Sequence, residues 1–364
     1  MKILIEPKPF KDESFVSWFC RTAFSNGTDP KSFALSIWNQ DSMFYRDLDR
    51  FIPNENANDI EKTSLLSKNS IKWLTLEPLI NEVDTSKSKN QYKKWYFLLP
   101  LAQKGKLRTN GIHFCPECLK SKTPYVNKFW RLSWFIICPI HKIELLSNCP
   151  KCNHIFAPEK QDYFHPYIYL CCQCKYDLRE TELKPINEKL LSFQKKLTNI
   201  FANKTINFSF NLLITKSKKD LFLTINILLS FVYKVLRQPI RFNKLIQALE
   251  LQIQHEFISI HNGTFSRLNS TDRYVLLKII YKILCYTTND FIYVLKQSEI
   301  TQNILQQTFK TLSPTIVYIK KHLSNKKLKR NTSKPKRLIL PKTQDEVLKL
   351  FKEISPYLTN RFRQ

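Results

Sequence analysis

Eight of the ten cysteines in this sequence lie between residues 111 and 182, and most of them stand in pairs separated by two residues. Such a pair forms a tight knuckle that offers two ligands to one metal ion. The first pair, Cys115 and Cys118, is followed after 19 residues by Cys138 and His141. Since two knuckles close a tetrahedral zinc site, the spacing predicts a first structural zinc ion.

A second set of ligands follows in the same pattern. Cys149 and Cys152 form the first pair, and 18 residues separate them from Cys171 and Cys174. Cys172 is an alternative to Cys171, but only Cys171 stands two residues from Cys174 in the knuckle spacing. The sequence therefore predicts two zinc ions per chain, with the choice between Cys171 and Cys172 left open.

Other side chains that can bind metal are expected to have structural roles. Three histidines lie close enough to serve as alternative ligands, and we expect them to be surface or packing residues: His113, His154 and His165. Cys20 and Cys285 occur on apolar helical faces, so we expect them in the core.

The pattern of ligands argues against an enzyme. All four positions of each predicted zinc site are filled by protein, which leaves no open position for a reactive water. His255 and His261 stand six residues apart, whereas a zinc-protease helix needs a spacing of four. The chain has four glycines and no Walker-type loop. We therefore expect a recognition protein without catalytic residues.

Charge is unevenly distributed along the chain. Of the net charge of +28, most comes from residues 183–364, which hold 32 basic and 10 acidic residues. A basic half of this kind usually faces a polyanion, and nucleic acid is the commonest one in a cell. A lysine-rich proteome is the alternative explanation. The first residues carry no export signal and no stretch is long enough to span a bilayer, so we expect a bacterial cytoplasmic, nucleoid-associated protein.

Helical periodicity brackets the cysteine-rich region. The segment from Asp12 places Phe15, Phe19 and Ala23 on one helical face, with Gly27 at the position of a left-handed cap. Asp29 and Pro30 then resemble the start of a second helix. This pattern allows a helix-turn-helix-like domain or an ordinary helical bundle.

We expect a mainly α protein with an N-terminal helix-turn-helix-like domain, two central zinc-ribbon-like modules, and a helical C-terminal domain with a basic tail. Apolar residues at helical spacing, including Leu245, Leu249, Ile253 and Phe257, support the C-terminal helices. The predicted domain boundaries are 1–110, 111–182, 183–325 and 326–364, the last with a terminal helix at 347–354.

A second helix pair is expected near the basic segment. Residues 299–308 are predicted to be helical, and Ser313 and Pro314 supply the cap and first position of a following helix. If this helix enters a DNA groove, Thr315 and Tyr318 are candidates to contact bases. Residues 320–342 hold ten basic residues and no acidic one. The candidate phosphate-binding residues are Lys320, Lys321, Lys326, Lys327, Lys329 and Arg330.

The motifs resemble the TniQ/TnsD family of transposon target-selection proteins. The array FCPECL, Tyr125, Trp130, CPIH, Leu145 and CPKC is similar to the paired zinc units of that family. The opening PKPFKDESFVSWFCRTAFSNG resembles the N-terminal helix of TniQ proteins, closest to those of type I-F CRISPR-associated transposons. The resemblance covers residues 7–27 and 113–174.

This resemblance implies transposition target selection. Resemblance to the Cascade-associated branch of the family implies an adaptor that links a Cascade complex, with guide RNA and target DNA, to the AAA+ regulator TnsC. In that branch the resemblance also allows the protein to form a head-to-tail homodimer. The TnsD branch implies direct recognition of an attachment site in DNA. A generic zinc-containing DNA-binding regulator is a third possibility, and none of the three implies a membrane partner.

Overall fold

The computed structural model is mainly helical, and residues 1–325 form one compact unit. No β-strand occurs in the described part of the chain, where extended segments pair only through isolated bridges. Residues 326–364, which include the predicted terminal helix, lie outside the described residues. The structure describes residues 2–39, 46–84, 95–101, 111–183, 186, 188–203, 210–215, 217–253, 264–306 and 311–325.

Helix α1 (Phe15–Ser25) forms as the apolar spacing predicts. Ser14 caps it, because its side-chain oxygen accepts a hydrogen bond from the backbone N–H of Ser17. Phe15, Trp18, Phe19 and Ala23 are all buried. The chain leaves the helix through Gly27, whose φ of +68° is the left-handed conformation that the sequence predicted at this position.

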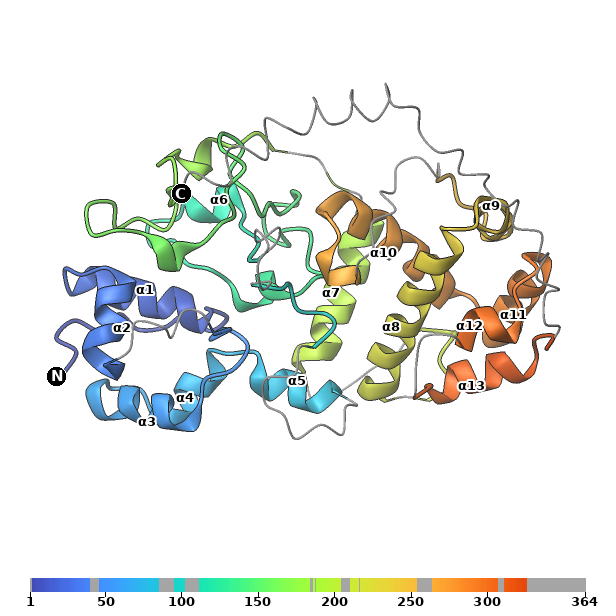
Figure 1. The fold of residues 1–364 in the computed structure, drawn as a ribbon, viewed down its shortest axis with the longest axis horizontal. Helices are drawn as coiled ribbons and strands as arrows, with labels where there is room; N and C mark the ends of the chain where they lie inside the picture. Colours follow the sequence, from blue (N-terminus) through green and yellow to red (C-terminus); the bar gives the residue numbers. More distant parts are fainter. Residues whose placement is uncertain are drawn as a thin grey trace, which may run out of the picture. The chain divides into compact units, whose positions relative to one another are not determined.

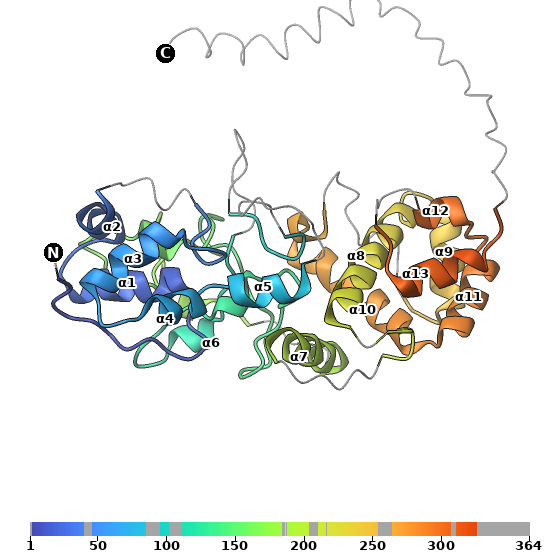
Figure 2. The same cartoon turned by 90° about the horizontal axis from the view of Figure 1, so that it is seen from below.

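The remaining N-terminal helices pack one after another (Figures 1 and 2). Asp29 caps α2 as predicted, because its side chain accepts hydrogen bonds from the backbone N–H groups of Lys31 and Ser32. Pro30 occupies the first turn of this helix, also as predicted. Neighbouring helices in this series contact each other from α1 to α5. The helices after α1 are α2 (Pro30–Trp38), α3 (Asn54–Thr63), α4 (Lys68–Trp73) and α5 (Glu77–Val83).

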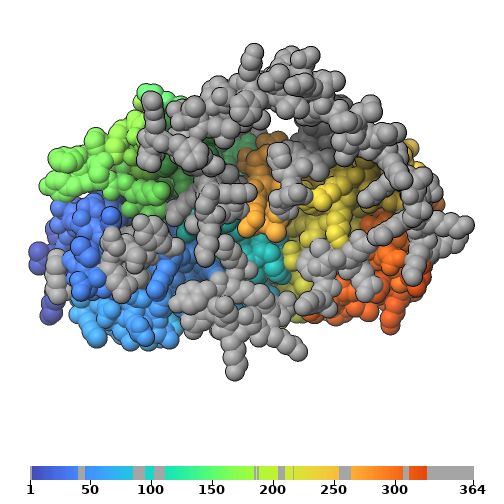
Figure 3. All heavy atoms as spheres, viewed as in Figure 1, coloured from blue at the N-terminus to red at the C-terminus, as the bar shows by residue number. Residues whose placement is uncertain are grey.

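The cysteine-rich region contains short helical turns and bridges. Its one α-helix, within residues 111–183, is α6 (Pro116–Leu119). Figure 3 shows this region, in green, beside the blue N-terminal helices. The turns are η2 (Lys128–Arg131), η3 (Pro158–Lys160) and η4 (Leu178–Glu180), and η3 packs against both α1 and α2.

The C-terminal part is a bundle in which α8 contacts α9, α10, α12 and α13 (Figure 2). Helix α8 (Lys218–Val235) is the longest in the described chain and buries most of its apolar residues. The others are α7 (Glu188–Ala202), α9 (Pro239–Ala248), η6 (Phe265–Arg267), α10 (Ser270–Cys285), α11 (Thr288–Gln297), α12 (Gln302–Gln306) and α13 (Pro314–Lys321).

Two expectations about these helices were wrong at their ends. The helix predicted through Leu249 and Ile253 ends at Ala248, because Glu250 adopts a left-handed φ of +54°. The helix predicted from residue 299 begins at Gln302, since Glu299 has a φ of +56°. In both cases a non-glycine residue takes a conformation that a helical pattern does not reveal. Phe257 lies outside the described residues.

An aromatic cluster joins the three predicted parts of residues 1–325. The ring of Trp95 packs edge-on against Trp134 of the cysteine-rich region, at 5.7 Å between centroids, and stacks on Phe201 of α7 at 5.4 Å. Phe222 of α8 lies against the same rings. A shared core of this size packs the segments into one body. The division of this body into domains ending at residues 110 and 182 stays a prediction.

Among the described residues, no helix combines the length and the apolar composition that crossing a lipid bilayer requires.

Candidate metal centres

The structure brings together Cys115, Cys118, Cys138 and His141 in one cluster whose ligand atoms all lie within 4.8 Å of one another. The sulfur atoms of Cys118 and Cys138 are 3.7 Å apart, and Nδ1 of His141 lies 3.3 Å from the sulfur of Cys118. Ligands about 2.3 Å from a tetrahedral zinc ion are separated by about 3.8 Å for two sulfurs. The cluster therefore has the size and donor set of a structural zinc site.

A second cluster holds Cys149, Cys152, Cys171 and Cys174. The sulfurs of Cys149 and Cys174 lie 3.7 Å apart, and those of Cys152 and Cys171 lie 3.6 Å apart. These separations again suit a tetrahedral ion held by four thiolates. Cys172 is outside the cluster, so the structure places Cys171 at the fourth corner.

Three of the four knuckles share one backbone geometry. At Cys138, the N–H donates to the carbonyl of Ile143 at 2.8 Å, and the N–H of Lys142 donates to the carbonyl of Cys138 at 2.9 Å. Lys142 has a φ of +53°, which turns the chain back beside the metal ligands. Equivalent bonds and a left-handed residue recur at the other two knuckles, where the left-handed residues are Asn153 and Lys175.

The knuckle at Cys115 differs because it starts a helix. Cys115 is the N-cap of α6, and its sulfur accepts a hydrogen bond from the N–H of Cys118 at 3.5 Å. Pro116 occupies the first turn, where its missing N–H costs nothing. The CPxC motif thus caps a helix and presents two ligands with the same four residues.

Hydrogen bonds to sulfur favour the thiolate form at one corner of each cluster. Hydrogen bonds lower the pKa of Cys138 to about 2. The largest contributions come from the thiols of Cys115 and Cys118, and smaller ones come from the backbone amides of His141 and Ile140. Burial raises the pKa of Cys174, but backbone and thiol hydrogen bonds outweigh it and lower that pKa to about 7. Thiolate is the metal-binding form of cysteine. A bound divalent cation would lower the pKa of the remaining thiols, so that they too lose their protons.

The start of α1 is bonded to the loop between the ligand pairs of the first cluster. The N–H of Ser14 donates to the carbonyl of Val126 at 2.8 Å, and the N–H of Lys128 donates to the carbonyl of Asp12 at 2.8 Å. The hydroxyl of Tyr125 donates to a carboxylate oxygen of Asp12 at 2.9 Å. Helix α1 and the first metal module therefore form one structural element.

The alternative histidine ligands lie elsewhere. His113 is fully buried, and its Nε2 faces Arg273 at 2.9 Å. Nδ1 of His165 lies 2.9 Å from the carboxylate of Asp162. His154 belongs to neither cluster and supplies the carbonyl that closes the Cys149 knuckle. All three therefore have packing or surface roles.

One of the two remaining cysteines does not fit its expected place. Cys20 is buried in α1 as expected. Cys285 is exposed, which corrects the expectation that it lies in the core. It ends α10, where the following residue already leaves the helix.

The predicted nucleic-acid residues are only partly described. Ser313 caps α13 as expected, but Thr315 is fully buried and its hydroxyl oxygen accepts from the N–H of Ile214 at 3.1 Å. Thr315 is therefore unable to contact a base in this conformation, which corrects that expectation. Tyr318 is 39% exposed and Lys321 is exposed, while Lys320 is half-buried. Lys326, Lys327, Lys329 and Arg330 lie outside the described residues.

Sequence reasoning missed an aromatic surface on the second metal module. Tyr167 stacks on Tyr169 at 5.1 Å, and the guanidinium of Arg179 lies 3.8 Å above the ring of Tyr169. Phe164 is 84% exposed and Tyr163 is 56% exposed, a few residues earlier in the chain. The run YFHPYIY between the ligand pairs was the available signal. We call Tyr163, Phe164 and Tyr167 the aromatic loop.

Comparison with known proteins finds a similarity in the N-terminal part of the chain. Residues 4–145 match the model of the TniQ family, and no curated protein matches the chain. The matched stretch contains α1 to α5 and the whole first cluster, and ends before the second cluster. TniQ is a non-catalytic domain of transposon targeting. Residues 4–145 are therefore similar to the TniQ domain, a domain that is associated with target selection in transposition.

Proposed function

We propose that this protein is a target-selection adaptor that links an RNA-guided Cascade complex to a TnsC-type AAA+ regulator. The observation that carries the proposal is the TniQ match over residues 4–145. The contacts of Asp12 and Ser14 with the loop of the first metal module support it, because they make the matched stretch one rigid surface.

The metal clusters support a binding role. Each cluster presents four protein ligands, so a zinc ion held there has no position for water or substrate. Zinc would then act by fixing the backbone of each module, as it does in other structural sites. We propose two structural zinc ions per chain.

The aromatic loop is the surface that we assign to a protein partner. Exposed aromatic residues are characteristic of interface centres. Tyr167 of the loop stacks on Tyr169, and the guanidinium of Arg179 lies over the ring of Tyr169. Residues 149–182 hold four basic and five acidic residues, so this module offers little attraction to phosphate. Phe164, at 84% exposure, is the most accessible of the three side chains.

Co-purification with the Cascade complex and guide RNA of the same genomic locus tests the adaptor proposal. We expect wild-type protein to be retained, and expect Phe164→Ala together with Tyr167→Ala to weaken retention at least tenfold. Ile240→Ala is a matched control, since Ile240 is 75% exposed on α9. Absence of any complex with Cascade or with the AAA+ regulator would contradict an adaptor.

Direct recognition of an attachment site in DNA is the second candidate function. The charge of residues 183–364 favours it, with 32 basic and 10 acidic residues. Helix α13 adds an exposed edge that carries Val317, Tyr318 and Lys321. A gel-shift assay on DNA flanking the transposon separates the two functions, because sequence-specific binding by the protein alone requires no guide RNA.

A further inference from the structure

A groove of about 600 Å³ lies between α9 and α11, two helices that pack against each other outside the metal centres. Each helix lines the groove with one face, because its lining residues are three or four positions apart. The helices run in opposite directions along it. Lys244 of α9 pairs with Glu299 beyond the end of α11, whereas Glu250, beyond the end of α9, pairs with Lys282 in the last turn of α10.

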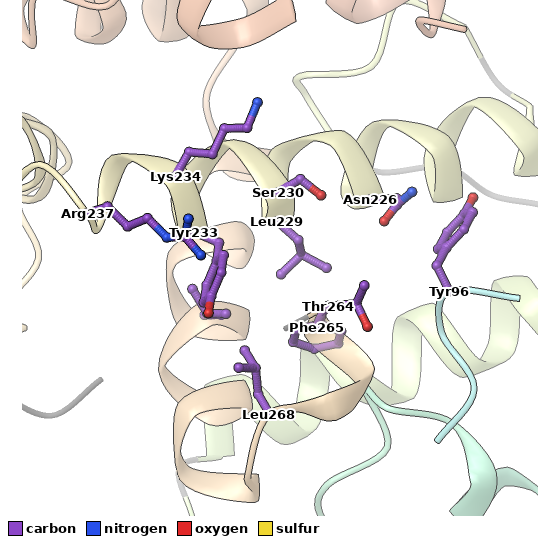
Figure 4. Close-up of a pocket in the computed structure, with 11 residues that line it drawn as sticks. Tyr96, Asn226, Leu229, Ser230, Tyr233, Lys234, Arg237, Thr264, Phe265 and Leu268 are labelled. Atoms are coloured by element: carbon purple, nitrogen blue, oxygen red, sulfur yellow. The ribbon is translucent and has the colours of Figure 1, made fainter. Parts of the chain in front are cut away.

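The polar lining distinguishes this groove from a cavity of about 480 Å³ beside α8. Apolar side chains such as those of Leu229, Phe265 and Leu268 border the α8 cavity, and none of the described residues that line it is acidic (Figure 4). The groove between α9 and α11 is lined instead by carboxylates, glutamine amides and tyrosine rings. Such a lining suits a polar ligand with a positive charge.

The groove is negatively charged within a basic part of the chain. Lys244 is the only cation among the described residues that line it, and the ion pair with Glu299 neutralises that charge. The carboxylates of Glu250 and Asp290 line the same groove. Residues 183–364 otherwise hold 32 basic and 10 acidic residues. This local reversal of sign attracts a cationic group and repels phosphate.

A lysine of the protein already makes the contacts that such a cation would make. Nζ of Lys282 lies 5.5 Å from the centroid of the Tyr286 ring and 3.4 Å from a carboxylate oxygen of Glu250. A cation over an aromatic ring and beside a carboxylate is stabilised by both groups. Tyr286 and Glu250 therefore show, at one end of the groove, the chemistry of a cation site.

A second pair of this kind lies on α11. Asp290 and Tyr293 are three positions apart, so their side chains are neighbours on one face of the helix. The hydroxyl of Thr287 donates to one carboxylate oxygen of Asp290 at 2.6 Å, which holds that side chain in place. Tyr293 is 64% exposed, and no cation of the described chain lies over its ring. A partner can therefore supply the cation here.

We propose that the groove between α9 and α11 binds an arginine side chain of a protein partner, with its guanidinium stacked on Tyr293 and paired with Asp290. A guanidinium is planar, so it can stack on a ring while it donates two parallel hydrogen bonds to a carboxylate. Its five N–H groups need several acceptors, and the amide oxygens of Gln247 and Gln297 supply further ones in the groove. A lysine has only three donors and no planar face.

Two features favour an arginine within a protein over free arginine. Ala248 and Val294 line the same groove and can contact the methylene stem of the side chain. Free arginine would also bring its α-carboxylate close to Glu250 and Asp290, which would repel it, whereas an arginine within a peptide carries no such charge. The groove is thus an interaction surface in addition to the aromatic loop.

Titration with a capped pentapeptide, acetyl-Gly-Ala-Arg-Ala-Gly-amide, tests the proposal on the full-length, zinc-loaded protein by ligand-observed NMR. The net charge of +28 repels this cationic probe elsewhere, so saturable binding reports a specific site. Citrulline in place of the arginine keeps the shape of the probe and removes its charge, and we expect affinity to fall about tenfold. Tyr293→Leu and Asp290→Asn should each weaken binding of the arginine peptide about fivefold or more. Asparagine keeps the oxygen that accepts from Thr287.

Trp73→Leu and Glu55→Gln are the matched controls and should bind the arginine peptide as the wild type does. Trp73 is an aromatic residue of α4 with 52% exposure, and Glu55 is an exposed acid in the first turn of α3, as Asp290 is in α11. Absence of saturable binding, equal affinities for the arginine and citrulline peptides, or unchanged affinity in Tyr293→Leu would overturn the proposal. Free arginine that binds as tightly as the peptide would exclude a protein partner. Unfolding midpoints establish that each variant is folded.

Discussion

The guanidinium of Arg273 on α10 donates a hydrogen bond to Nε2 of His113, with 2.9 Å between the nitrogen atoms, and both side chains are fully buried. Burial lowers the pKa of Arg273 to about 10, so the arginine remains a cation at neutral pH. His113 stands two residues before the first cysteine of the metal clusters. This contact therefore ties the first metal module to the C-terminal helices.

We predict strong coupling between these two residues. His113→Leu should cost about 2–3 kcal/mol, because the hydrogen bonds that remain to the buried cation among the described residues are those to the carbonyls of Ser133 and Asn269, both at 3.3 Å. The double variant with Arg273→Leu should be less destabilised than the sum of the single variants. Urea unfolding in the presence of zinc measures this cycle. Additive effects would show that the hydrogen bond contributes no coupling.

Metal content should distinguish Cys171 of the second cluster from its neighbour Cys172. We expect two zinc ions per wild-type chain, one in Cys171→Ser and two in Cys172→Ser. Since structural zinc binding is worth on the order of 10 kcal/mol, losing it should unfold the module locally while the α-helical circular dichroism persists. Elemental analysis of the purified variants checks this. Loss of zinc in Cys172→Ser with retention in Cys171→Ser would reassign the ligand.

The left-handed residue of the Cys138 knuckle gives a test of backbone strain. Lys142 has a φ of +53°, which costs roughly 1 kcal/mol for a residue with a Cβ. Lys142→Gly should be neutral or slightly stabilising, whereas Lys142→Val should be destabilised by about 1–2 kcal/mol and bind zinc less tightly. Competition with a chelator measures the affinity. Equal affinities in both variants would mean that the knuckle does not need this conformation.

The sequence allowed the ligand clusters and helix starts to be predicted because both depend on local spacing. The CPxC and CPxH pairs fix two ligands within one turn of backbone, and the predicted caps Asp29 and Ser313 cap helices through their own side chains. These signals lie within four residues of the feature that they determine.

Features that depend on tertiary packing escaped prediction. Thr315 has the polarity of a surface residue but is buried against the N–H of Ile214, a neighbour about a hundred residues away in the chain. Helix α9 ends early because Glu250 adopts a left-handed backbone conformation, and a glutamate in the sequence does not indicate that conformation. A cavity lined by Tyr96, Asn226 and Phe265 combines residues from segments more than a hundred positions apart, so no local pattern marks it.

Asp49 makes stability depend on pH. Burial raises its pKa to about 6, although the cationic charge of Arg131 and the N–H of Val16 act in the opposite direction. The folded state keeps this proton up to pH 6, whereas the unfolded chain releases it near pH 4. Its contribution to stability is therefore present at low pH and is lost as pH rises through 6. Relative to wild type, Asp49→Asn should gain about 1–2 kcal/mol between pH 5 and pH 8.

Paired unfolding curves at pH 5 and pH 8 measure this gain, with zinc saturating at both values. Asn keeps the acceptor oxygen that Asp49 presents to the N–H of Val16 at 2.9 Å, so the comparison isolates the charge. A difference in unfolding free energy between Asp49→Asn and wild type that is the same at both pH values would show that Asp49 does not titrate in this range.

Salt dependence of DNA binding tests the basic C-terminal segment. If lysine and arginine side chains there neutralise phosphates, the logarithm of affinity should fall with the logarithm of salt concentration at a slope near −0.9 per contact. Replacing Lys326, Lys327, Lys329 and Arg330 by glutamine should flatten that slope by roughly 3 to 4 units. The matched control replaces four exposed lysines of the N-terminal region, namely Lys2, Lys8, Lys31 and Lys62.

Base preference should respond to a different position. Phosphate contacts position a protein without reading sequence, so the glutamine variant should keep whatever preference the wild type has. Tyr318 is 39% exposed on α13, with its ring 4.4 Å from that of His322, and Tyr318→Ala should alter the preference if α13 enters a major groove. Thr315→Ser should leave it unchanged because Thr315 is buried. If the glutamine variant of Lys326, Lys327, Lys329 and Arg330 has the same salt slope as the wild type, the positive charge of these residues serves only to solvate the C-terminal segment. The adaptor function then stands without a DNA-binding role.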